Sequence, residues 1–125
     1  MQGVRLLIVD DRIQVRQELR SLLPLAGEIY GLPVEIVGEA RDGQEAVEQA
    51  RSLQPAVILM DLEMPRLNGF EATRILKTMQ PAPRVVAFTI NNPTQVGDRA
   101  IEAGVDRLVE KGSPIRDILQ AIHST

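Results

Sequence analysis

A regular alternation of short apolar runs with amphipathic stretches, repeated five times along the chain, constrains the fold more than any other feature. Short and almost continuously apolar runs are typical of strands that are buried on both faces of a parallel sheet. The amphipathic stretches between them suit helices that cover such a sheet. We therefore predict an α/β fold with strands at residues 4–9, 34–38, 56–60, 85–88 and 107–109.

The helices that should cover this sheet carry apolar side chains three or four positions apart, which places them on one face of each helix. We interpret these stripes as core, so that no cofactor is needed to explain them. The stripes are Val15, Leu19, Leu22 and Leu23; Ala72, Ile75, Leu76 and Met79; Val96, Ala100 and Ala103; and Ile115, Ile118, Leu119 and Ile122.

Two kinds of signal mark the starts of helices. Asp42 with Glu45, and Asn68 with Glu71, have the spacing of a capping box, in which the first side chain accepts a bond from a first-turn amide. The second signal is a polar cap followed by a first-turn proline, which has no amide hydrogen to leave unpaired. The pairs with this pattern are Asn92-Pro93 and Ser113-Pro114.

Prolines also predict where helices end, because proline lacks an amide hydrogen and its ring clashes with the preceding turn. We expect Pro24, Pro55 and Pro81 to end the helices before them. Residues 25–33 should then form the one irregular segment of the chain.

Length and composition indicate one globular domain that spans residues 1–125. With 44% hydrophobic and 25% charged residues, the chain can bury a core of ordinary size. The absence of cysteine excludes disulfides, thiolate catalysis and cysteine-bound metals. The apolar run at residues 4–9 is too short for a signal peptide, and no run approaches the ~20 residues of a membrane span. We therefore expect a cytoplasmic protein that makes no membrane contact.

The charge distribution argues against nucleic acid as a partner of this domain alone. The formal net charge is −3, and the 14 lysines and arginines are scattered along the chain instead of forming a basic stripe. Tyr30, Phe70 and Phe88 are the only aromatic residues, so the chain offers no platform on which bases could stack.

Polar residues follow the predicted strands at the positions where an open parallel sheet binds its ligands, outside the carboxyl ends. Taken singly, each is more often a cap, a turn or a surface residue, and only the set indicates a function. The set comprises Asp10 and Asp11 after the first strand, Asp61 after the third, Thr89 after the fourth and Lys111 after the fifth.

Three neighbouring carboxylates raise one another's pKa unless a cation lies among them, and oxygen ligands of this kind suit Mg²⁺. A carboxylate can then attack a phosphoryl group and form an acyl phosphate. The Lys111 ammonium and the Thr89 hydroxyl would hold the phosphoryl oxygens. The residues therefore predict a phosphoryl-transfer site. The phosphorylated carboxylate would be held by Thr89 and Lys111, so the loops after the fourth and fifth strands would respond to its presence.

The motifs resemble those of the receiver domains of two-component response regulators, and the resemblance covers nearly the whole chain. It implies a flavodoxin-like, doubly wound sheet of five parallel strands in the order 2-1-3-4-5, with five helices. The matching motifs are Ile8-Val9-Asp10-Asp11, Gly38-Glu39-Ala40 with Asp42-Gly43, Asp61-Leu62-Glu63-Met64-Pro65 with Asn68-Gly69, Thr89, Ala103-Gly104 and Lys111.

The resemblance also implies a role for each site residue. Asp61 resembles the phosphoacceptor, while Thr89 and Lys111 resemble the hydroxyl and the ammonium that contact the phosphoryl group. The groups that resemble the Mg²⁺ ligands are Asp11, Asp61, the backbone carbonyl of Glu63 and, indirectly, Asp10.

A signalling module, rather than a metabolic enzyme, is the function that the resemblance implies. The phosphoryl donor would be a partner histidine kinase or phosphotransfer protein, and the domain would catalyse only its own phosphorylation and dephosphorylation. The changed surface would lie on the fourth helix, fifth strand and fifth helix, where it could promote a homodimer or control an attached DNA-binding domain. His123, the only histidine, should be solvated near the chain end, so we do not interpret it as a phosphodonor.

The sequence departs from the family pattern at three places. Ile90 stands where a small residue is common, and its side chain should narrow access to the acceptor and slow phosphoryl gain or loss. Leu108 replaces a frequent aromatic residue, so coupling to the outer face should be weaker or should run through loop movement. Residues 24–33 are longer than the pattern, and we expect a surface loop insertion there.

Two alternatives belong to other functional classes. A small phosphohydrolase could use Asp61 as nucleophile with Glu63 as the second acid, although the short chain lacks a domain to close over substrate. A phosphorylation-independent interaction domain is favoured slightly by Ile90 and Leu108. Gly69 and Gly104 meet backbone requirements, because the chain has no glycine-rich nucleotide-binding pattern.

Overall fold

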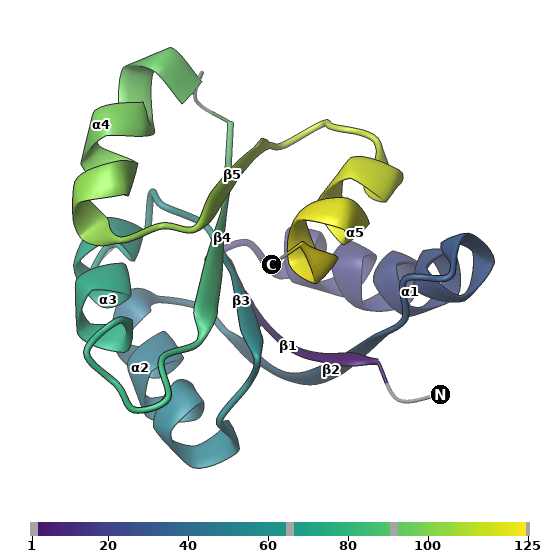
Figure 1. Ribbon diagram of the computed structural model, residues 1–125, viewed down its shortest axis with the longest axis horizontal. Coiled ribbons are helices and arrows are strands. Elements are labelled where there is room, and N and C mark those ends of the chain that lie inside the picture. The colour runs from purple at the N-terminus through teal and green to yellow at the C-terminus, as the bar shows by residue number, and fades with distance from the viewer. Residues whose placement is uncertain (1–2, 65–66, 91–92, 125) are drawn as a thin grey trace.

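A computed structural model describes residues 3–64, 67–90 and 93–124, with the side chains of residues 93–95 excepted. Five parallel strands form one sheet: β1 (Val4–Val9), β2 (Val34–Ala40), β3 (Val57–Met60), β4 (Arg84–Thr89) and β5 (Arg107–Glu110). Their order in space is β2-β1-β3-β4-β5, as predicted (Figure 1). Each predicted strand is present, and no bound differs from its prediction by more than two residues.

The register brings the carboxyl ends of the central strands to one level. Val9, the last residue of β1, pairs with Ala40 on one side and with Met60 on the other. Met60 in turn pairs with Ala87, and Thr89 pairs with Glu110. Because the strands are parallel, the residues that follow them emerge at the same end of the sheet.

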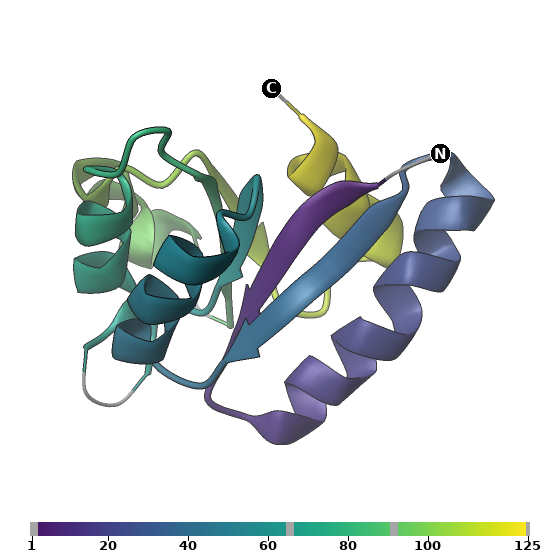
Figure 2. The ribbon, with the colours of Figure 1, turned by 90° about the horizontal axis from the view of Figure 1, so that it is seen from below.

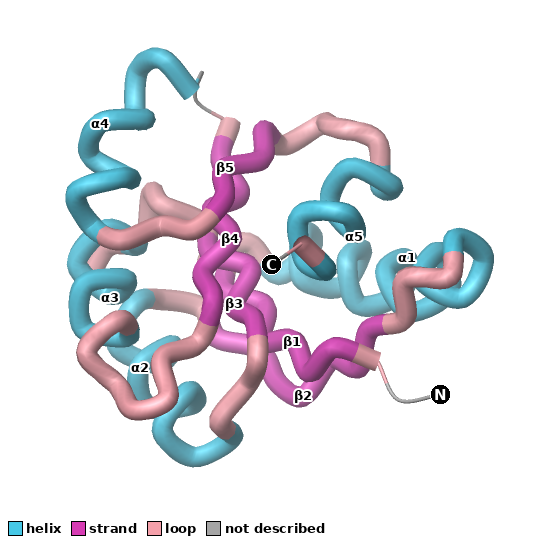
Figure 3. Tube along the Cα trace, viewed as in Figure 1, coloured by secondary structure: helices cyan, strands magenta, loops and turns pink. Residues whose placement is uncertain are grey.

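Helices cover both faces of the sheet. α1 (Ile13–Tyr30) and α5 (Ile115–His123) lie on one face, and α1 runs alongside β1 and β2 (Figure 2). α2 (Gly43–Leu53), α3 (Gly69–Leu76) and α4 (Pro93–Ala103) lie on the other face (Figure 3). Within the described residues, no helix combines the length and the apolar character needed to cross a membrane.

The alternating side chains of the strands divide the aliphatic core into two clusters, one on each face of the sheet. On the α1 and α5 face, Leu6, Ile8, Leu59 and Val86 pack with Leu23 and Leu119 of the helices. On the other face, Leu7, Val9, Ile58 and Met60 pack with Leu76 and Ala100. The apolar stripes predicted from the sequence lie in or against these clusters, with Leu22 as the exception. The α2 residues Ala46, Val47 and Ala50, for which no stripe was predicted, complete the second cluster.

The first helix is longer than predicted, because Pro24 lies inside α1 and does not end it. Proline removes the amide that would bond the carbonyl of Arg20, but Arg20 is on the exposed side of the helix, where water can replace the donor. Beyond Pro24 the helix still buries Gly27 and continues to Tyr30. The irregular segment and the loop insertion predicted for residues 24–33 are therefore wrong.

The end of α1 is set by Gly31 instead. Gly31 has a φ of 69°, in the left-handed region that glycine adopts readily. The next amide, that of Leu32, donates to the carbonyl of Gly27 at 2.8 Å and closes the helix end. α2 ends at Leu53, just before Pro55, as expected. α3 ends at Leu76, well before Pro81, because the amides of Thr78 and Met79 turn back to the carbonyls of Ile75 and Leu76, so the role predicted for Pro81 is wrong.

Two of the predicted helix caps are confirmed. The side chains of Asp42 and Asn68 accept bonds from the amides of Glu45 and Glu71, at 2.8 and 3.0 Å. At α5 the prediction is wrong, because Pro114 is itself the capping residue and the helix begins at Ile115 without a side-chain cap. The cap predicted at Asn92 lies outside the described residues.

Two side-chain positions also differ from expectation. Leu22 is 43% exposed, because it lies on a side of α1 that faces solvent. Of the stripe predicted for this helix, only Leu19 and Leu23 are buried. His123 is half-buried instead of solvated, and its Nε2 lies 2.8 Å from the carbonyl oxygen of Pro33. This contact ties the last helix to the start of β2.

Candidate functional site

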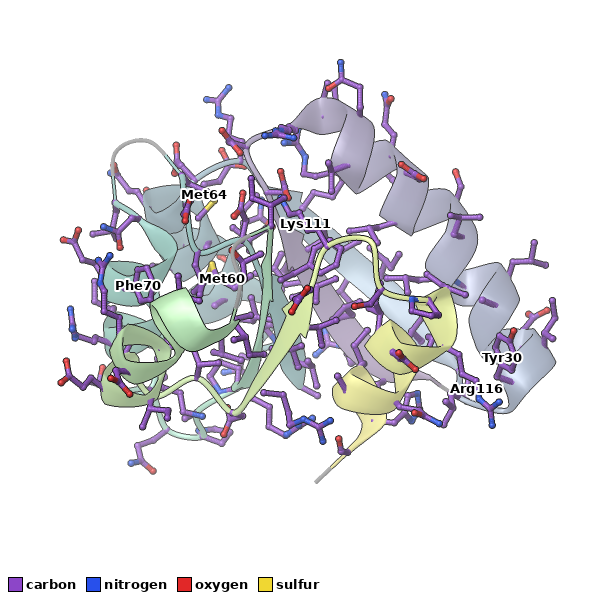
Figure 4. The ribbon with its side chains drawn as sticks, turned by 90° about the horizontal axis from the view of Figure 1, so that it is seen from above. Tyr30, Met60, Met64, Phe70, Lys111 and Arg116 are labelled. Atoms are coloured by element: carbon purple, nitrogen blue, oxygen red, sulfur yellow. The ribbon has the colours of Figure 1, made fainter. Side chains whose placement is uncertain are left out.

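The residues predicted to form the site gather at the carboxyl end of the sheet. Asp10 and Asp11 directly follow β1, Asp61 follows β3, and Lys111 follows β5. Thr89 is the last residue of β4 and is buried. Figure 4 shows Lys111 at this end of the sheet, on the same side as Met64 of the loop after β3.

Three carboxylates form the centre of the site. One oxygen from each of Asp10, Asp11 and Asp61 can be chosen so that all lie within 4.8 Å of one another. Asp10 and Asp61 are only 1% and 5% exposed, whereas Asp11 is exposed. Such a cluster of partly buried negative charge is costly unless cations balance it.

Lys111 supplies the protein's own balancing charge. Its Nζ lies 2.8 Å from Oδ2 of Asp10 and 3.5 Å from Oδ2 of Asp61. The backbone amide of Lys111 donates to the carbonyl of Thr89 at 2.7 Å, which joins the ends of β4 and β5. The ammonium is therefore held over two of the three acids by the sheet itself.

Asp10 is fixed by its own backbone turn. Its Oδ1 accepts a bond from the amide of Arg12 at 2.9 Å, and its amide donates to Ala40 of β2 at 3.0 Å. The Lys111 ammonium, at 2.8 Å, is the one group among the described residues that faces its buried Oδ2. A second cation beside Oδ2 would complete the surroundings of this carboxylate.

The pKa of Asp61 is raised from its ordinary value of 3.8 to about 6. Burial is the largest cause, and the charges of Asp10 and Asp11 add to it. The hydrogen bond from the amide of Glu63 to Oδ1, at 3.0 Å, and the charge of Lys111 oppose the shift. A metal ion among the three acids would favour the ionised form, which is the nucleophilic one.

The donor set fits a hard divalent cation. Three carboxylates supply anionic oxygens, two of them from buried side chains and one from an exposed side chain. Mg²⁺ and similar ions are bound through one or two carboxylates and keep positions for water and phosphate oxygens. The acidic cluster can therefore hold a metal ion.

Two glycines, at the starts of α2 and α3, hold the loop after β3 close to these helices. The amide of Gly69 donates to the carbonyl of Leu62 at 3.1 Å, and a Cβ at Gly69 would lie against the carbonyl of Asp61. The amide of Gly43 donates to the carbonyl of Leu67 at 2.9 Å, and a Cβ there would collide with the same carbonyl. At these two positions the loop that carries Asp61 leaves no space for a side chain.

The comparisons with known proteins agree with this geometry. The sequence matches the family model described as response regulator receiver domain over residues 6–123. The chain belongs to this family. As a receiver domain of a two-component response regulator, it is a signalling domain.

Curated relatives of this receiver domain are response regulators. Response regulator GacA of Pseudomonas viridiflava is 38% identical over 119 residues, which are 95% of this chain and 53% of that protein. The nitrate/nitrite response regulator protein NarL of Escherichia coli K12 is 33% identical over 118 residues, covering 94% of this chain and 52% of that protein. The chain therefore spans about half the length of the curated relatives that it matches.

Solved structures share the fold of this receiver domain. A two-component response regulator of the LuxR family from Aurantimonas sp. SI85-9A1 superposes with a TM-score of 0.85 at 32% identity, covering 97% of this chain and 83% of that one. The receiver domain of the putative response regulator NarL from Mycobacterium tuberculosis gives 0.87 at 26% identity, covering 98% and 94%.

The three departures from the family pattern have different outcomes. Ile90 directly follows β4, and its side chain is 62% exposed beside the site. Leu108 of β5 is partly buried against the core on the α4 face. The predicted insertion at residues 24–33 is instead the last part of α1 and the turn after it.

The structure also shows two contacts near the receiver site that the sequence reading missed. The guanidinium of Arg16 reaches back from α1 to the carbonyl of Asp10 at 2.6 Å. Arg99 of α4 lies 4.0 Å from the ring centroid of Phe70, at the start of α3. Arg16 lies about one turn into the helix that follows the two acids, and only this position in the sequence could have suggested its contact with Asp10.

Proposed function

We propose that Asp61 accepts a phosphoryl group from a phosphohistidine of a partner histidine kinase or phosphotransfer protein, in a reaction that requires Mg²⁺. A carboxylate oxygen of Asp61 attacks phosphorus while the P–N bond of the phosphohistidine breaks. The imidazole nitrogen leaves with the bonding electron pair and takes up a proton, and Asp61 becomes an acyl phosphate. The observation that carries the proposal is the cluster of three carboxylates with Lys111 across two of them.

Mg²⁺ would be held by Asp11, Asp61 and the backbone carbonyl of Glu63, with Asp10 acting indirectly. When bound, it would neutralise charge on the phosphoryl oxygens. The proposal for Glu63 is supported by its position in the loop after β3, where its amide already bonds Asp61.

Lys111 and Thr89 would recognise the transferred group. The Lys111 ammonium can move from its ion pair with Asp10 to a phosphoryl oxygen, since it already lies 3.5 Å from Asp61. Thr89 ends the neighbouring strand at the same level. Two donors that hold the phosphoryl group would stabilise its transfer and would tie the ends of β4 and β5 to its presence.

The domain would act catalytically only on itself. Water attack on the acyl phosphate would return Asp61 to its free form through the same charge stabilisation that supports phosphorylation. The output would be a changed surface on α4, β5 and α5, leading to a homodimer or to control of an attached effector domain. The length of the curated relatives, about twice that of this chain, supports an attached domain in the whole protein.

The test is a labelling experiment with a small acyl phosphate as donor. Wild type and Asp61→Asn are incubated with the donor and Mg²⁺, and intact-protein mass spectrometry measures the added phosphoryl group. We expect labelling of the wild type that requires Mg²⁺ and none of the Asn variant, since an amide cannot form the acyl phosphate. Equal labelling of the two proteins would contradict the acceptor assignment, and repeated turnover of a phosphomonoester would indicate a hydrolase.

A further inference from the structure

The turn between β1 and α1 carries two of the three clustered acids, but its helix end lacks the usual capping contacts. Residues 10–12 join the end of β1 at Val9 to the start of α1 at Ile13. The capping residue Arg12 makes no side-chain cap, and the first turn of α1 contains no acid. A helix start without these features is usually mobile, because its first amides lack partners.

The turn is held at Asp10 by the amide bond to Ala40 and by the ion pair with Lys111, and Arg16 adds two further long-range contacts. Its terminal nitrogen donates to the backbone carbonyl of Asp10 at 2.6 Å, and its Nε donates to Oε1 of Glu39 at 3.1 Å. The Arg16 side chain is 14% exposed and that of Glu39 is 22% exposed. The planar guanidinium thus bridges the turn after β1 and the end of β2, a geometry that lysine cannot reproduce with a single ammonium.

We propose that Arg16 is a positioning residue for the divalent-cation site, acting by fixing the peptide between Asp10 and Asp11; the inference rests on the proposed Mg²⁺-dependent function. The carbonyl that Arg16 contacts belongs to this peptide unit, which is planar. Holding its oxygen sets the direction in which the backbone enters Asp11.

Asp11 depends on this contact more than Asp10 does. The Asp10 carboxylate is already held by the amide of Arg12 and by Lys111. Asp11 is exposed, and we propose that it contacts the metal directly. A loss of Arg16 should therefore loosen Asp11 and weaken metal binding, while Asp61, directly after β3, stays in place.

The effect of Arg16 is geometric rather than a matter of net charge. Its positive charge is paired with Glu39, so the pair adds little to the potential at the three acids. Glu39 also accepts a bond from Arg20 at 2.6 Å, but the side chain of Arg20 is 68% exposed and solvent screens it. Arg20 shares the helix and the acidic partner of Arg16, and its bond goes to Glu39 rather than to the turn. It is therefore a matched control.

The test is calorimetric titration of Mg²⁺ into the metal-free protein at neutral pH, well below the unfolding temperature. Arg16→Met keeps an aliphatic side chain and removes the guanidinium. We expect its Mg²⁺ dissociation constant to rise about tenfold, as for other residues that orient metal ligands. For Arg16→Lys the rise in the dissociation constant should be roughly half as large on a logarithmic scale, since one ammonium can keep one of the two bonds. Arg20→Met should match the wild type.

Kinetics provide a second readout. In Arg16→Met the Mg²⁺ concentration for half-maximal phosphorylation by a small acyl phosphate should rise with the dissociation constant. The rate at saturating Mg²⁺ should stay within a factor of about two of wild type, because the acceptor and Lys111 are untouched. Far-UV circular dichroism and thermal unfolding establish that each variant is folded at the temperature of titration.

The outcomes separate this inference from the proposed function. If both Arg16 variants bind Mg²⁺ as the wild type does and only their melting temperatures fall, Arg16 is a structural residue and the inference is wrong. If Arg20→Met weakens binding as much as Arg16→Met does, charge rather than positioning is responsible, which also overturns it. If the wild type neither binds Mg²⁺ nor becomes labelled, the proposed function itself fails.

Discussion

The two ends of the parallel sheet differ in what they offer a ligand. At the amino end, a cavity of about 440 Å³ opens beneath α2, lined by Arg5, Arg51, Gln54 and the prolines before β4. At the carboxyl end, three acidic side chains and one lysine lie close together. Cavities of about 360 and 340 Å³ also adjoin the carboxyl end, beside Glu63 and beside Lys111. Volume alone therefore does not single out one end, although large pockets are the usual first candidates for binding sites. In this fold, strand direction indicates the functional end better than cavity size does.

The sharpest test of this difference is Lys111→Met, which removes the cation at the carboxyl end. We expect the rate of phosphorylation by a small acyl phosphate to fall about 100-fold, the loss typical when one group that stabilises transition-state charge is removed. The measurement is phosphoryl incorporation over time by intact-protein mass spectrometry. A rate within threefold of wild type would show that the carboxyl end does not work through Lys111.

Asp61, at the carboxyl end, should also make the free energy of unfolding of the domain depend on pH. Asp61 has a folded pKa of about 6 against an ordinary value of 3.8, so between these values the folded state retains a proton that the unfolded chain has lost. The free energy of unfolding should therefore fall as pH rises from about 4 to about 6, by up to roughly 3 kcal/mol.

Asp61→Asn removes this ionisation and isolates its contribution. In metal-free buffer the variant should be more stable than wild type at pH 7.5, and the difference should shrink toward pH 4, as measured by urea unfolding. Mg²⁺ should narrow the difference at pH 7.5, because it binds the folded wild type more strongly. Stability curves that run parallel from pH 4 to pH 7.5 would contradict the assignment of this pKa.

At the amino end, the corresponding change is Arg5→Met, which should affect stability alone. The guanidinium of Arg5 donates to the carbonyls of Leu53 and Gln54 at 2.8 Å each and so closes the end of α2. Their loss should cost about 1 kcal/mol, a modest amount because the contacts are exposed. Phosphorylation should be unchanged. A slower phosphorylation at full folding would mean that the two ends are coupled.

The smallest effect is expected from Ile90→Ala, at the rim of the carboxyl end. Since the side chain is 62% exposed, its removal should hardly change stability. It should admit donor and water more readily, raising phosphorylation and dephosphorylation roughly threefold. Both rates can be followed by labelling and by loss of label after donor removal. If neither rate changes, Ile90 does not narrow the site.

The sequence predicted the strands well because burial on both faces of a parallel sheet requires nearly continuous apolar runs. The runs ending at Val9 and Met60 end within a residue of the observed strands, and strand direction then placed Asp10 and Asp61 together. The helices were harder to predict. Pro24 is tolerated within α1, because a helix that keeps burying its face can forgo one exposed hydrogen bond.

Contacts between distant side chains could not be predicted from spacing alone. Arg16 and Glu39 are 23 positions apart, and their bond depends on the register of β2 against β1. The raised pKa of Asp61 likewise depends on how deeply the sheet end is covered. Patterns along the chain identify which groups meet at the strand ends, whereas their orientation and protonation follow from packing around them.

Gly43 and Gly69 have a consequence for the evolution of this site. At either position a single added methyl group would collide with backbone of the loop that carries Asp61, and backbone cannot rotate away as a side chain can. In a library of all single substitutions, these two positions should therefore tolerate replacement as poorly as the acids do. The residues most restricted in identity near the acceptor include two that contribute no functional group at all.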